Sequence, residues 1–77
     1  YRELLLTNRQ YAFARFTDSQ GILVAVNNDE AEAAVSIPVP FQDKTYINLK
    51  TQEPAAVENG RIQLTLKPAG TVLMVIQ

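Results

Sequence analysis

The side chains most able to do chemistry in this chain are its carboxylates, since the sequence contains no histidine and no cysteine. Asp29, Glu30 and Glu32 lie within four residues of one another, in a segment typical of a turn. A pair of carboxyl groups can run acid–base hydrolysis when an apolar wall keeps one of them protonated. No apolar segment in this stretch could supply that wall. We therefore interpret the cluster as a solvated turn.

Other site chemistries are also missing from the sequence. The run Asn27–Glu30 superficially resembles a calcium loop, but it lacks the glycine at the sixth position, and its spacing does not fit the helix–loop–helix pattern. We interpret it as an Asx-type turn. Without histidine or cysteine, the usual nucleophile–base pairs cannot be built, and the three glycines are too dispersed for a phosphate loop. We predict no catalytic, cofactor-binding or metal-binding residue here.

Aromatic rings could bind a sugar by stacking, and the chain has three tyrosines, three phenylalanines and no tryptophan. We expect most of these rings in the core or at an interface. Tyr46 is the best candidate for a weak sugar contact. Ile47 and Leu49 alternate with it and are expected to take the inner face of their strand, which would leave Tyr46 exposed.

Arg15 is unusual because it shares strand parity with Tyr11 and Phe13, which we expect to be buried. Its guanidinium either reaches water at a strand end, or pairs with a carboxylate or carbonyl at a domain interface. The first interpretation leaves the guanidinium in water, and the second places it against polar groups of another domain.

An interface is favoured by bulky side chains on both faces of two segments, residues 11–16 and 22–26. One face can fill the core of a sandwich, and the other then needs a cover. We expect that surface at the edge near Tyr1 and Leu4, with Arg15 close by, because the chain would enter there from a missing domain.

The segments that carry these residues have the sequence patterns of β-strands. Residues 61–67 alternate polar and apolar side chains, and Asn59-Gly60 before them is a hairpin-turn signal. The continuous apolar run 22–26 is typical of a central strand, and Pro38 and Pro40 end another strand and bar central pairing there. We predict an all-β fold: one domain over residues 1–77, a small antiparallel β-sandwich of about seven or eight strands, Greek-key-like.

Composition excludes several classes of partner. Seven basic and eight acidic residues give a net charge of −1, which argues against nucleic acid and against an anionic membrane surface. No apolar run approaches the roughly 18–20 residues of a membrane span. The absence of cysteine excludes disulfides but leaves the compartment, cytoplasmic or secreted, undetermined.

In sequence order, these strand patterns resemble the C-terminal β-sandwich, or domain C, of the alpha-amylase family of glycoside hydrolases. The stretches that carry the resemblance are residues 11–15, 22–28, 46–51 and 60–68. They show an aromatic-rich strand with an arginine, a hydrophobic strand ending in asparagine, and final strands split by a proline. The neopullulanase, cyclomaltodextrinase and maltogenic amylase enzymes are the most similar. Gln52 departs from the family, in which glycine is common after Thr51, so the turn there is expected to differ.

The resemblance implies a non-catalytic C-terminal domain of an alpha-glucan-cleaving hydrolase. In that family the catalytic carboxylates lie on a barrel domain that precedes domain C, and no position here matches their motifs. The implied partner is the upstream catalytic barrel domain of the same chain, which this domain would stabilise, with weak alpha-glucan contact at most. A stand-alone carbohydrate-binding module would need exposed coplanar aromatics. A protein-interaction sandwich would need an exposed apolar patch and no sugar site.

Overall fold

The computed structural model describes residues 2–17 and 20–77, and in this part of the chain all regular structure is β-strand. The described residues form nine strands in two antiparallel sheets, which confirms the predicted all-β sandwich with slightly more strands than the seven or eight expected. The larger sheet has the order β1-β2-β3-β9-β5-β6, and the smaller has the order β4-β8-β7. The strands are β1 (Arg2–Leu6), β2 (Gln10–Phe16), β3 (Gly21–Asn27), β4 (Ala33–Pro38), β5 (Tyr46–Asn48), β6 (Pro54–Ala55), β7 (Val57–Glu58), β8 (Arg61–Leu66) and β9 (Thr71–Ile76).

The local structures that the sequence indicates most clearly form as predicted. Asn59 and Gly60 have φ angles of 55° and 75°, the two positive values that a type I′ hairpin turn requires, and this turn joins β7 to β8. On β8, Ile62 and Leu66 are buried. Strand β4 ends at Pro38 and pairs with β8 alone among the described strands, as the prolines predicted.

The turn after Thr51 has a backbone conformation that suits glycine. Gln52 has a φ of 64°, in the left-handed region that glycine enters without steric cost. The Gln52 backbone N–H donates to the Asn48 carbonyl at 2.8 Å, and its side-chain amide donates to the Leu49 carbonyl at 3.0 Å. These two contacts hold a non-glycine residue in this conformation.

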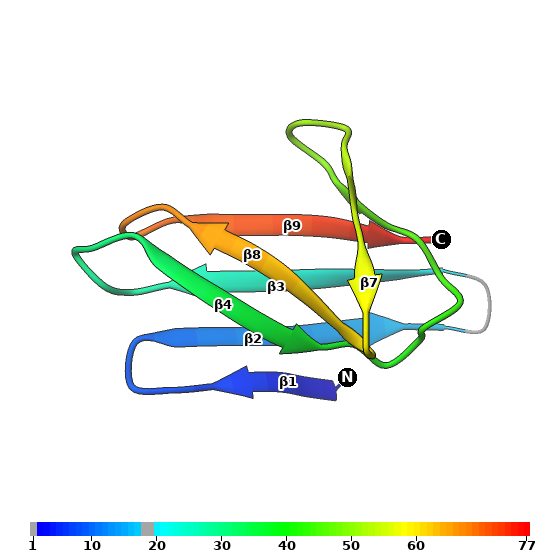
Figure 1. Ribbon diagram of the computed structural model, residues 1–77, viewed down its shortest axis with the longest axis horizontal. Helices are drawn as coiled ribbons and strands as arrows, with labels where there is room; N and C mark the ends of the chain where they lie inside the picture. Colours follow the sequence, from blue (N-terminus) through cyan, green and yellow to red (C-terminus); the bar gives the residue numbers. More distant parts are fainter. Residues whose placement is uncertain (1, 18–19) are drawn as a thin grey trace.

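The core lies between the two sheets, and their contributions differ in size. The larger sheet presents small side chains on β2 and β3, with Ala12, Ala14 and Ala25 completely buried. The smaller sheet faces them with branched aliphatic side chains such as Ile37 and Ile62. In Figure 1, β4 and β8 cross obliquely over β2 and β3. The larger sheet also buries Leu23, Tyr46 and Met74 between the sheets.

Asn27 is a buried amide side chain of the described core, at 1% exposure. Its Nδ2 group donates to the carbonyl oxygens of Ala31, Leu66 and Lys67 at 3.0, 3.3 and 3.1 Å. Its Oδ1 atom accepts hydrogen bonds from the Asp29 backbone N–H and the Gln10 side-chain amide. Asn27 therefore ties the end of β3, in the larger sheet, to the end of β8, in the smaller sheet.

Tyr46 corrects the prediction that it is exposed, because its side chain is completely buried. Tyr46 pairs with Ile76 in the register of β5 and β9, and its side chain takes the inner face, while Leu49 is 46% exposed. The Tyr46 hydroxyl donates to the Phe41 carbonyl oxygen at 2.7 Å and accepts from the Phe41 N–H at 3.2 Å. These two bonds satisfy the buried hydroxyl, so its polarity did not force the ring outward.

Substitution of Asn27 tests its role in joining the sheets. Asn27→Ala should lower the free energy of unfolding by about 2–3 kcal/mol, because it leaves buried carbonyl oxygens without donors. Denaturant unfolding measures this loss. The matched control is Asn28→Ala, at an exposed position one residue along the chain, which should stay within about 0.5 kcal/mol of the wild type. Equal losses in the two variants would contradict this role.

Tyr46 should make the domain sensitive to alkali. Burial raises the pKa of the Tyr46 phenol above its usual 10.0; the bond with Phe41 lowers it and nearby Asp43 raises it. The raised pKa keeps the folded phenol neutral, so stability is fully present below pH 10 and falls above it, where the unfolded tyrosine ionises first.

Tyr46→Phe should therefore cost about 1–3 kcal/mol at pH 7, from the lost hydroxyl bonds, and should flatten the fall in stability above pH 10. Urea unfolding of both proteins between pH 7 and pH 11 measures the two effects. Tyr11→Phe, whose ring lies outside the core, controls for the loss of a tyrosine hydroxyl elsewhere. Parallel pH curves for wild type and Tyr46→Phe would show that the buried phenol is not responsible.

Candidate functional site

The face of the larger sheet that is turned away from the smaller sheet carries a continuous set of apolar side chains, which we call the outer apolar face. Its residues follow from strand register: Phe13 pairs with Val24, which pairs with Leu73, and Ile22 pairs with Val75, which pairs with Ile47. They alternate with core residues, so they point outward. The members are Leu6, Tyr11, Phe13, Ile22, Val24, Val26, Ile47, Leu49, Leu73 and Val75.

Several of these side chains are far more exposed than a core residue. Ile22, Leu49 and Leu73 expose 42%, 46% and 45% of their surface, and Leu6 exposes 65%. The described strands form two sheets, and Figure 1 shows β4 and β8 of the smaller sheet crossing over one side of β2 and β3. No described strand lies over the opposite side. A contiguous apolar surface of this kind typically marks a site of association.

The outer face of the smaller sheet is polar by contrast. Arg61 donates from Nε to Ser36 Oγ at 2.8 Å and from a terminal nitrogen to the Ser36 carbonyl at 3.0 Å. Gln63 donates to the same Ser36 Oγ at 3.0 Å. These polar groups bond to one another and are exposed to water. The sandwich therefore has one face suited to solvent and one face that is not.

Two aromatic residues that we expected to be buried lie on the outer apolar face. Tyr11 and Phe13 are half-buried, with ring centroids 5.4 Å apart and ring planes tilted by 40°. Their inward neighbours on β2 are the buried alanines, so the bulk of this strand points away from the sandwich core. The bulk predicted on both faces of this segment is uneven, because the inner face carries Ala12 and Ala14 and has an aromatic ring at Phe16 alone. Aromatic residues are enriched at protein interfaces.

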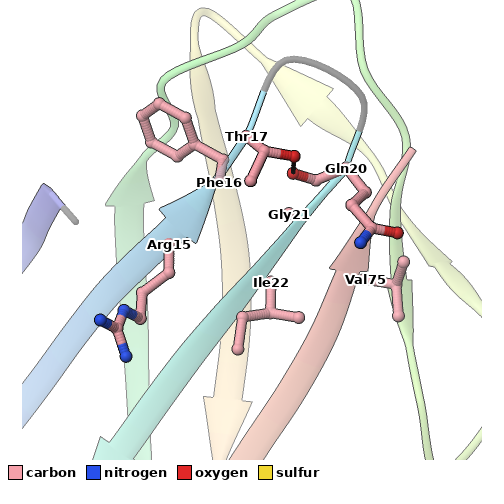
Figure 2. Close-up of a pocket in the computed structure, with 7 residues that line it drawn as sticks. All are labelled: Arg15, Phe16, Thr17, Gln20, Gly21, Ile22 and Val75. Carbon is pink, nitrogen blue, oxygen red and sulfur yellow. Dashed lines mark hydrogen bonds between the residues drawn. The ribbon is translucent and has the colours of Figure 1, made fainter.

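Arg15 lies at the end of β2, on the same face as Tyr11 and Phe13, as the strand parity predicted. Its register partner is Ile22, and Arg2 of β1 pairs with the preceding Ala14, so Arg15 lies beside the start of the chain. Figure 2 shows its guanidinium extending away from the sheet.

A hollow of about 530 Å³ opens beside Arg15, lined also by Phe16, Thr17, Gln20, Gly21, Ile22 and Val75. Phe16 lies on the other face of the strand and packs edge-on against Phe41, with centroids 4.8 Å apart. A second hollow of about 370 Å³ is lined by Asn48, Leu49, Lys50, Thr71, Val72 and Leu73. Each hollow combines apolar walls with one cationic side chain.

Leu4, a second predicted interface residue, does not lie on this face. Leu4 is buried in the sandwich core at 9% exposure, which corrects its assignment to an interface. The pairing of β1 with β2 shifts between Glu3 and Leu5, and this bulge turns Leu4 inward. Tyr1 lies outside the described residues. Sequence reasoning missed that the exposed Leu73 and the half-buried Ile47 lie on this face. The signal for Leu73 was the run of apolar side chains at successive positions of β9, which is typical of a strand with two buried faces.

The acidic segment forms a turn, as interpreted. Asn27 Oδ1 accepts from the Asp29 N–H at 3.1 Å, and the Asp29 carboxylate accepts from the Ala31 N–H at 3.3 Å, two Asx-type contacts. Within residues 2–17 and 20–77, no three side chains of the metal-binding types gather closely enough to hold an ion. The same residues include no helix that is long and apolar enough to cross a membrane.

Comparison with solved structures finds the same sandwich fold as one part of much longer chains. A complex of AmyP with maltotriose is 17% identical, with a TM-score of 0.85 over 97% of this chain and 16% of that chain. An Anoxybacillus alpha-amylase gives 17% identity and a TM-score of 0.80, over 97% of this chain and 17% of its own. Alpha-galactosidase I from Mortierella vinacea gives 12% identity and a TM-score of 0.76, over 97% and 22%. These identities show the fold alone.

This chain therefore spans about a sixth to a fifth of the length of these structural relatives. A search of curated proteins finds no match. The family model described as "Maltogenic Amylase, C-terminal domain" matches residues 1–73. The chain belongs to this family of maltogenic amylase C-terminal domains, which confirms its resemblance to domain C of alpha-amylase-family glycoside hydrolases.

Proposed function

We propose that this chain is a non-catalytic C-terminal domain of an alpha-glucan-cleaving glycoside hydrolase, and that it packs on the catalytic barrel domain of the same chain and stabilises it. The observation that carries the proposal is the outer apolar face. The domain folds around a core on one side of its larger sheet and leaves the other side apolar.

The energetics favour a cover on that face. Burying a single valine, leucine, isoleucine or phenylalanine side chain is worth about 1.5–3 kcal/mol relative to leaving it exposed. Ten partly exposed side chains on one face therefore represent a gain of order 10 kcal/mol, before the cost of ordering the contact. A partner in the same polypeptide is held at high effective concentration, which reduces the cost of association.

The family supports a catalytic domain as the partner. The domain is by its family the C-terminal part of maltogenic amylases, and its structural relatives are about five times longer or more. One of these relatives is an alpha-amylase, and another is bound to maltotriose. Among the described residues the acidic segment at Asp29 forms an Asx-type turn, which supports the proposal that the hydrolytic groups of the parent lie on its other domain.

A matched pair of lysine substitutions tests the packing. Leu73→Lys changes the centre of the outer apolar face, and Thr65→Lys changes an outward position on β8, the middle strand of the smaller sheet. In the full-length parent, Leu73→Lys should lower the free energy of unfolding by roughly 2–4 kcal/mol, because it places a charge in an apolar contact. Thr65→Lys should have little effect. Equal stability of the two variants in thermal unfolding would argue against packing on this face.

A stand-alone carbohydrate-binding function is the second candidate, and the outward Tyr11–Phe13 pair is the observation that favours it. The tilt of 40° between the rings does not give the flat platform of a stacking site. Tyr46, the residue first proposed for sugar contact, presents no ring face to solvent because it is buried.

Titration of this chain with maltotriose should give a dissociation constant weaker than about 100 μM, equivalent to about −5.5 kcal/mol. Phe13→Ala should not change this weak binding. A tighter constant that is lost in Tyr11→Ala and Phe13→Ala would instead support the binding-module function.

A further inference from the structure

We propose that Arg15 anchors the covering domain by pairing with a carboxylate of that domain, and that this carboxylate enters the hollow beside Arg15. This inference rests on the proposed packing of the outer apolar face and names the chemistry of the partner at one position. It commits to a glutamate or aspartate side chain of the partner domain.

The surroundings of Arg15 supply apolar contact but no polar partner. Its neighbour across the strand is Ile22, and Val75 is the next residue in the same row of the sheet. Among the described residues, Arg15 makes no hydrogen bond or ion pair. Arg61 on the smaller sheet differs, since its guanidinium donates twice to Ser36.

Covering the outer apolar face would remove water from the Arg15 guanidinium. An arginine that is desolvated without a partner is strongly destabilising, so the cover must supply acceptors. A carboxylate supplies both charge and two oxygens in the planar geometry that matches the guanidinium fork. The hollow adds apolar walls from Ile22 and Val75, which suit the aliphatic stem of an acidic side chain.

Two acidic residues of this chain are near Arg15 in sequence or register. Glu3 pairs with Phe13, two residues before Arg15 on β2, but it forms no ion pair with Arg15. Asp18 follows Arg15 by three positions and lies outside the described residues. Glu3 and Asp18 must both be tested, because a carboxylate of this chain that pairs with Arg15 would take the place of one from the partner domain.

The experiment compares the full-length parent with Arg15→Met and Arg61→Met by thermal unfolding between pH 7 and pH 3. Pairing with an arginine lowers the pKa of a carboxylate, so the stability it gives is present above the unfolded value of about 4 and is lost as the pH falls through the folded value. Arg15→Met should lower the unfolding temperature by several degrees at pH 7, and the difference from wild type should disappear in acid. Arg61→Met should show a small difference that does not change with pH. Arg15→Lys should retain part of the stability and its pH dependence.

Each other outcome overturns a stated part of the account. An effect of Arg15→Met that is independent of pH would mean that a carbonyl, and not a carboxylate, receives the guanidinium. Loss of the pH dependence in Glu3→Gln or Asp18→Asn would place the carboxylate in this chain. No effect of Arg15→Met, with Leu73→Lys still destabilising, would refute the anchor and leave the packing intact. No effect of either substitution would refute the proposed packing as well.

Discussion

The structure depends on one mismatch: among the described residues, a six-stranded sheet with two largely apolar faces is covered by a three-stranded sheet on one face alone. The smaller sheet directs Ile37 and Ile62 into the core and keeps polar side chains on its outer side. The outer face of the larger sheet is mainly apolar, with Arg15 near one end. The inner face of that sheet is lined on β2 with Ala12 and Ala14 and on β3 with Leu23 and Ala25, while the aromatic Phe13 of β2 points outward. Most of the apolar bulk of β2 therefore lies where this chain cannot cover it.

The sandwich nevertheless has its own means of holding its two sheets together. Asn27 makes its hydrogen bonds at one end of β3, and Tyr46 bonds to Phe41 beside Ile76, which pairs with the other end of that strand. These two buried polar side chains fix opposite ends of the core, and both have their hydrogen-bonding groups satisfied. The described domain has a defined core without a partner, and the outer apolar face is a separate feature added to that core.

The sequence predicted those elements whose local signals agree with one another. The alternation of β8, the hairpin at Asn59 and Gly60, and the edge position of β4 all rest on short-range geometry that holds in any sandwich. Which side chains of β5 point into the core was not predictable in the same way. Tyr46, Ile47 and Leu49 are all hydrophobic enough for either face, and the burial of Tyr46 depends on a backbone partner at Phe41. The inward turn of Leu4 depends on a bulge that no residue type signals. The position of Arg15, in contrast, followed from parity alone.

The fold does not specify the substrate of the parent, because the same sandwich occurs in an alpha-amylase and in an alpha-galactosidase. The central claim concerns the cover on the outer apolar face, and chemical labelling tests it most directly. Leu73→Cys and Thr65→Cys would be placed separately in the full-length parent, in a background otherwise free of cysteine, and in this 77-residue chain. We predict that the thiol at position 73 reacts many times more slowly in the parent than in the short chain, while the thiol at position 65 reacts equally fast in both. Equal reactivity of the thiol at position 73 in the two proteins would contradict the account.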